Sequence, residues 1–138
     1  MKIAILNGPN LNLIGTRETD IYGTETFEEY FNKLVKIYDK IDFHYFQSNI
    51  EGDLINEIQR AAKSIDGIIL NAGAYTHTSI AIGDAVASIK IPVVEVHISN
   101  IEAREEFRRH SHISAKCSGT IFGFGLKGYL LAVESFLH

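Results

Sequence analysis

Residues 41–73, IDFHYFQSNIEGDLINEIQRAAKSIDGIILNAG, decide the fold. The aromatic and apolar run over 41–47 predicts a strand, and the apolar run over 67–70, closed by Asn71-Ala72-Gly73, predicts another. Between them, apolar residues recur at helical spacing over 51–63. A strand, a helix and a second strand at this spacing form a βαβ unit, which predicts a parallel sheet.

The same alternation extends in both directions from this stretch. The further strands expected are 2–6, 92–98 and 120–124, and the further helices expected are 25–39, 78–88, 101–110 and 126–137. Thr24 or Thr26 is expected to cap the helix over 25–39. About five strands with helices on both faces predict an α/β fold, a flavodoxin-like three-layer sandwich with a five-stranded parallel sheet. A length of 138 residues suits one domain, over 1–138.

Composition excludes several classes of protein. Thirteen basic against seventeen acidic residues give a net charge of −4, which argues against a general nucleic-acid binder. No apolar run approaches the roughly 20 residues of a membrane span, and no signal peptide is visible. A single cysteine, Cys117, fits a reducing compartment. The expectation is a cytoplasmic protein with no nucleic-acid or membrane partner.

Ligands of such sheets bind beyond the carboxyl ends of the strands. The first such loop, NGPNLN at 7–12, has one glycine and lacks the pattern of a phosphate-binding loop. Its asparagines offer neutral donors and acceptors, or serve only as turn residues. The long connection over 15–23 is expected to be a lid, in which Arg17 would lower the pKa of Tyr22. The alternative is a surface loop with a solvated arginine and a packed tyrosine.

The strand over 92–98 carries Glu95 and His97, whose side chains point to the same side of the sheet. A carboxylate beside an imidazole raises the pKa of the histidine and fixes its tautomer, which suits a general acid. A satisfied buried polar pair is the alternative. His77, just before a helix, is expected to be neutral. Asp84, seven residues on, would share its helix face, or be an ordinary exposed acid.

Backbone N–H groups at Ile98-Ser99-Asn100, where the strand stops, are suited to bind a carboxylate. Arg108 follows closely enough to reach the same crevice, where its guanidinium suits a hydroxylated or anionic small molecule. The spacings typical of metal sites and the serine-hydrolase elbow do not occur, so no metal is expected.

Five motifs, in order along the whole chain, together resemble the type II 3-dehydroquinate dehydratase family. They are NGPNLN at 7–12, GTRETDIYG at 15–23, NAGAYTHTS at 71–79, EVHISN at 95–100 and REEFRRHS at 104–111. The closing GFGLKGY at 123–129 is also similar to the family. The resemblance implies the flavodoxin-like fold, no metal or organic cofactor, and a homododecamer built from trimers.

The resemblance also implies a reaction, the dehydration of 3-dehydroquinate to 3-dehydroshikimate in the shikimate pathway, by anti elimination through an enolate. Tyr22 would be the base, held as a phenolate by Arg17. Asn10 would hold an ordered water that stabilises the enolate. His97, oriented by Glu95, would protonate the departing hydroxyl.

Substrate-binding residues are implied in the same way. Asn71 would hydrogen-bond the region of the departing hydroxyl, and the backbone of Ile98 and Ser99 would hold the substrate carboxylate. His77 and Arg108 would contact the ring hydroxyls.

Asp84 is implied to act across a subunit boundary and to complete a neighbouring site. Position 19 departs from the family, because Thr19 stands where proline is usual and would leave the lid backbone less restrained. A flavin or nucleotide carrier is disfavoured by the loop at 7–12. The remaining alternative is a non-catalytic flavodoxin-like module that binds a small molecule.

Overall fold

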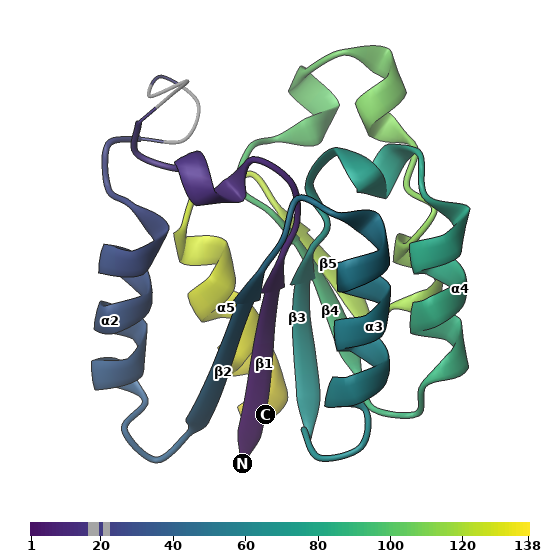
Figure 1. The fold of residues 1–138 in the computed structure, drawn as a ribbon. Coiled ribbons are helices and arrows are strands. Elements are labelled where there is room, and N and C mark those ends of the chain that lie inside the picture. Colours follow the sequence, from purple (N-terminus) through teal and green to yellow (C-terminus); the bar gives the residue numbers. More distant parts are fainter. Residues whose placement is uncertain (17–19, 21–22) are drawn as a thin grey trace.

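The computed structural model describes residues 1–16, 20 and 23–138. Its sheet has five parallel strands in the order β2-β1-β3-β4-β5 (Figure 1). The strands are β1 (Lys2–Asn7), β2 (Asp42–Gln47), β3 (Gly67–Asn71), β4 (Val93–His97) and β5 (Gly119–Phe122). This is the flavodoxin-like strand order, in which the order of addition of strands reverses between β1 and β3. The predicted fold class is confirmed.

Helices cover both faces of the sheet. They are α2 (Phe27–Ile37), α3 (Glu51–Ala61), α4 (Ile80–Ser88) and α5 (Lys127–Leu137). Successive side chains of a strand point to opposite faces. Ile3 and Ile5 therefore pack in the core shared with α2 and α5, and Ala4 and Leu6 in the core shared with α3 and α4. In the described part of the chain, no helix is long and apolar enough to cross a membrane.

Hydroxyl caps fix where two helices begin. Thr26 Oγ1 accepts a hydrogen bond from the backbone N–H of Glu29 at 3.1 Å, so Thr26 rather than Thr24 caps α2. Ser79 Oγ accepts from the N–H of Ile82 at 2.9 Å, which starts α4 two residues later than predicted. His77 therefore ends the preceding 3-10 turn η2 (Gly73–His77), and the prediction that it shares a helix face with Asp84 is wrong.

The charged stretch 101–110 does not form the single short helix that was predicted. It forms two 3-10 turns, η3 (Ile101–Ala103) and η4 (Glu106–Arg109), separated by the extended backbone of Arg104. No residue of η4 is buried, so a longer helix would gain little from packing. The stretch instead runs beyond the carboxyl ends of the strands, at the top of Figure 1.

Candidate active site

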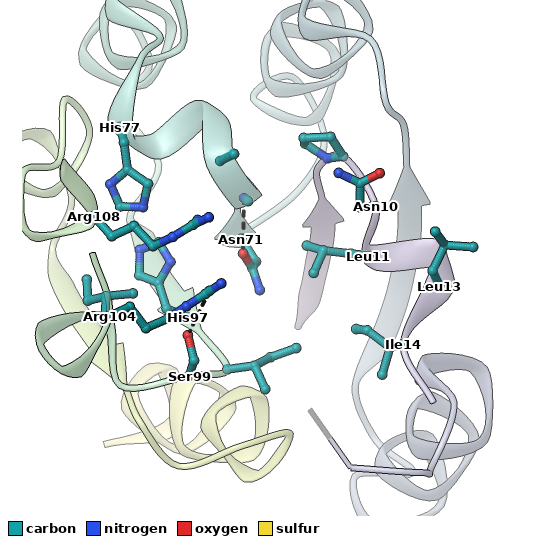
Figure 2. A pocket seen from close by; sticks show the side chains of 15 residues that line it. Asn10, Leu11, Leu13, Ile14, Asn71, His77, His97, Ser99, Arg104 and Arg108 are labelled. Carbon is teal, nitrogen blue, oxygen red and sulfur yellow. Dashed lines mark hydrogen bonds between the residues drawn. The ribbon is translucent and has the colours of Figure 1, made fainter. Parts of the chain in front are cut away.

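A cavity lies beyond the carboxyl ends of β1, β3 and β4, next to the point where the strand order reverses (Figure 2). This is the place that the fold class predicts for a ligand. Most of the predicted site residues line it: Asn10, Asn71, His77, His97, Ile98, Ser99 and Arg108.

Glu95 and His97 form a buried pair at the end of β4. His97 Nε2 is hydrogen-bonded to Glu95 Oε2, and the exposed fractions of the two side chains are 5% for His97 and 1% for Glu95. Only His97 of the two lines the cavity, so Glu95 supports it from below. Because alternate residues of a strand point to the same face, Glu95 and His97 lie on one side of the sheet, as the sequence predicts.

Two serines that the sequence analysis missed hold Glu95 in place. Ser114 Oγ donates to Glu95 Oε1 at 2.7 Å, and Ser111 Oγ donates at 3.2 Å. Ser111 Oγ also accepts the backbone N–H groups of Ile113 and Ser114, each at 3.0 Å, which orients its hydroxyl. The serines lie 16 and 19 residues from Glu95, so no local pattern pairs them with it, although Ser111 closes the quoted motif at 104–111.

These contacts decide the charge of the Glu95 carboxyl. Burial alone raises its pKa, but the hydrogen bond and charge of His97, with the hydrogen bonds of Ser114 and Ser111, outweigh burial and lower it. The carboxylate therefore stays ionised beside the imidazole.

His77 presents a second imidazole to the cavity. Its Nδ1 lies 2.8 Å from the backbone carbonyl oxygen of His110, so Nδ1 carries the proton and donates. Burial lowers the pKa of His77, and the charges of His97 and Arg108 lower it further. The ring is therefore neutral, as predicted, although burial rather than a helix N-terminus is the main cause. Its Nε2 is left as an acceptor.

The cavity has one cationic wall and one apolar wall. Arg104 and Arg108 extend beside His97, opposite Leu11 and Ile14 (Figure 2). Arg104 Nη1 donates to Ser99 Oγ at 3.3 Å. The two guanidinium groups favour an anionic or hydroxylated ligand. Arg104 is a site residue that the sequence analysis did not select, although it lies within a quoted motif.

Arg108 is held in position by its immediate neighbours. Its Nε donates to Glu105 Oε2, and its Cζ lies 5.0 Å from the centroid of the Phe107 ring. A stacked and paired guanidinium has fewer conformations to lose when a ligand binds.

Asn10, in the loop after β1, is a turn residue and also lines the cavity. Its φ of 69° is in the left-handed region, which asparagine tolerates better than most residues, and its side chain lines the cavity. Its backbone N–H donates to Asn49 Oδ1 at 3.0 Å, so the turn is anchored to the loop after β2.

Other predicted residues are not gathered at the cavity. Asp84 is exposed on α4 and does not line it. Arg17 and Tyr22 lie outside the described residues. Over the described ranges, no cluster of three or more histidine, cysteine, aspartate or glutamate side chains could hold a metal ion.

Comparison of the sequence with known families matches residues 1–137 to the model of the class II dehydroquinases. The chain is 55% identical to the 3-dehydroquinate dehydratase of Fusobacterium nucleatum, over 96% of this chain and 94% of the relative. It is 50% identical to that of Prochlorococcus marinus strain MIT 9301, over 99% of this chain and 95% of the relative.

Solved structures agree with this match. The fold is similar to the type II dehydroquinase of Butyrivibrio crossotus, with a TM-score of 0.97 and 47% identity over 100% of this chain and 98% of that one. It is also similar to a 3-dehydroquinate dehydratase-like protein of Bifidobacterium longum, with a TM-score of 0.71 and 28% identity over 98% and 94% of the two chains.

Proposed function

Because this chain belongs to the class II dehydroquinase family, we propose that it dehydrates 3-dehydroquinate to 3-dehydroshikimate. The observation that carries the proposal is the buried Glu95–His97 pair at the edge of a cavity with a cationic wall. The substrate is a hydroxylated carboxylate that must lose a hydroxyl group, and an acid held against an ionised carboxylate suits that step.

Tyr22, as a phenolate stabilised by Arg17, removes a proton from the carbon next to the substrate ketone, and the electron pair forms an enolate. Asn10 holds a water that donates to the enolate oxygen. When the enolate collapses, the new carbon–carbon double bond forms and the hydroxyl leaves. His97 gives that hydroxyl its proton on the opposite face, so water departs by anti elimination.

The geometry supports His97 as the acid. Glu95 occupies one nitrogen of its ring, so the other nitrogen is the one able to give a proton to the substrate. General acid catalysis of this kind contributes about 10²–10⁴ in rate.

The other lining residues supply substrate contacts. Arg108 and the backbone N–H groups of Ile98 and Ser99 are donors, which suits hydroxyl and carboxylate oxygens. His77 offers Nε2 as an acceptor for a hydroxyl proton, because its Nδ1 is already engaged. Asn71 lies next to His97 at the end of β3 and contacts the departing group.

We propose further that residues 1–138 form a single catalytic domain that needs no cofactor and acts in the cytoplasm. In this proposal the subunits assemble as a homododecamer of trimers. Asp84 fits a role in a neighbouring subunit's site, because it is exposed on α4 while its own cavity lies elsewhere.

A spectrophotometric assay with 3-dehydroquinate in the presence of EDTA tests the reaction, because the conjugated enone of the product absorbs in the ultraviolet. We expect rapid growth of absorbance. A flat trace from folded protein would overturn the proposal and favour the non-catalytic binding module.

Tyr22→Phe tests the base. The change removes the phenol oxygen with little change in volume, so turnover should collapse while the circular dichroism spectrum is preserved. Near-normal turnover of the folded variant would exclude Tyr22 as the base.

A further inference from the structure

A chain of buried hydrogen bonds lies beneath the cavity. Asn7 and Asn71 are the last residues of β1 and β3 and face each other in the sheet register. Tyr129, in the first turn of α5, bridges them. Asn71 Nδ2 lies 2.9 Å from Tyr129 Oη, and Tyr129 Oη lies 2.8 Å from Asn7 Oδ1.

The backbone N–H of Gly73 fixes the direction of every bond in this chain. It can only donate, and it lies 3.1 Å from Asn71 Oδ1, so the amide oxygen of Asn71 faces Gly73 and its Nδ2 group faces Tyr129. Tyr129 Oη accepts from Asn71 and must give its own proton to Asn7 Oδ1.

Tyr129 is held firmly in this position. The residue is 0% exposed, and the edge of its ring meets the Phe27 ring with centroids 4.9 Å apart. Burial raises the pKa of the Tyr129 phenol, so the hydroxyl remains a neutral donor and acceptor. Asn7 is 0% exposed and Asn71 3% exposed, so neither amide can exchange its protein partner for bulk water.

We propose that Tyr129 is a positioning residue, which together with the Gly73 N–H orients the Asn71 amide so that it presents an N–H donor, and not a carbonyl acceptor, to the ligand. The amide oxygen is engaged by Gly73 and one Nδ2 hydrogen by Tyr129, which leaves the second Nδ2 hydrogen for the cavity. The group bound at Asn71 is thus selected to be a hydrogen-bond acceptor, such as the oxygen of a hydroxyl. This inference rests on the proposed function for the identity of the substrate.

Tyr129→Phe, made in the full chain, is the test, and Tyr30→Phe is the matched control. The Tyr30 ring packs against Tyr129 at 6.4 Å between centroids but takes no part in the amide chain. We expect kcat/KM for 3-dehydroquinate to fall about tenfold in Tyr129→Phe, the equivalent of losing one hydrogen bond, with little change in Tyr30→Phe. Equal effects of the two changes would overturn the proposal.

A double-mutant cycle separates positioning from a general loss of stability. If Tyr129 acts through Asn71, then Tyr129→Phe should have little further effect on kcat/KM in an Asn71→Ala background. Losses that multiply would overturn the proposal. If Tyr129→Phe does not fold, Asn71→Asp serves instead, because it presents only acceptors. Asn71→Asp should then raise KM more than Asn71→Ala does. An equal or smaller rise in KM would contradict the claim that residue 71 donates a hydrogen bond to the ligand.

Turnover by the wild-type protein tests the proposed function separately from this inference. An inactive wild type contradicts the proposed reaction and does not bear on the role of Tyr129. A crystal structure of Tyr129→Phe then gives a readout that needs no turnover. We expect the Asn71 amide to rotate or shift, and an amide that keeps its wild-type position would overturn the positioning role.

Discussion

Two of the glutamate–histidine pairs in the described residues have similar contacts and different surroundings. Glu95 and His97 have side chains that are 1% and 5% exposed at the carboxyl end of β4. Glu57 of α3 and His44 of β2 also form a pair, with Nε2 and Oε1 2.7 Å apart, but these side chains are 10% and 39% exposed. His44 does not line the cavity.

The two carboxylates differ in the groups that they contact besides histidine. Arg60 Nε donates to both oxygens of Glu57, at 3.1 and 3.0 Å, and this bond is the main reason that the pKa of Glu57 is lowered. Arg60 thus shares the Glu57 carboxylate with His44. Glu95 instead has neutral serine hydroxyls, which stabilise the carboxylate without cancelling its charge. The Glu95 carboxylate therefore keeps its charge beside His97, whereas the Glu57 carboxylate is already paired with an arginine.

The largest expected effect is on kcat, when each of the two pairs is broken in a separate variant. We expect His97→Ala to lower kcat by about 10²–10⁴, the contribution of a general acid, and His44→Ala to leave kcat unchanged. Steady-state kinetics on folded protein decide this. Similar losses in both variants would mean that the contrast between the pairs has no functional meaning.

A smaller effect should follow from removing a serine from Glu95. Ser114→Ala deletes the 2.7 Å bond, so the pKa of Glu95 should rise, and kcat/KM should fall about tenfold, for one hydrogen bond to a charged group. The acid limb of the pH–rate profile should move to higher pH. Ser88→Ala is the control, because Ser88 Oγ donates to the backbone of its own helix, at Ala85. An unchanged profile in Ser114→Ala would contradict the role given to the serines.

Glu57→Gln should affect stability and not turnover. It removes the charge between Arg60 and His44 at a partly exposed site, and should lower the free energy of unfolding by about 1 kcal/mol. Urea denaturation at low and high salt measures it, and the difference from wild type should shrink as salt screens the charges. A loss of turnover in this variant would give the second pair a role in catalysis.

The smallest expected effects are changes in the free energy of unfolding with pH. The pKa of His77 and that of Glu95 are both lowered in the folded protein, so each contributes stability above its unfolded pKa and loses it as pH falls. The free energy of unfolding should decline first below about pH 6.5, through His77, and again below about pH 4.3, through the glutamates. His77→Gln should remove only the first decline. A curve unchanged by that substitution would show that another group titrates there.

Local sequence patterns predicted the helices and strands whose apolar residues recur at regular spacing on one face. The βαβ stretch over 41–73 and the cap at Thr26 agree with the structure because hydrophobic spacing and capping act over a few residues. The stretch 101–110 did not follow its helical spacing, because it has too little buried apolar surface to be held as one helix.

The amino-acid order alone was enough to place Glu95 and His97 together, since a strand repeats every two residues, and to put Asn71 and His97 at strand ends. It was not enough to identify their supports. Tyr129 lies 58 residues from Asn71 and 122 from Asn7 in the chain, and Ser114 lies 19 from Glu95. Such partners meet only when packing of α5 and of the segment after η4 closes long loops, and no local periodicity records which side chains that packing brings into hydrogen-bonding distance.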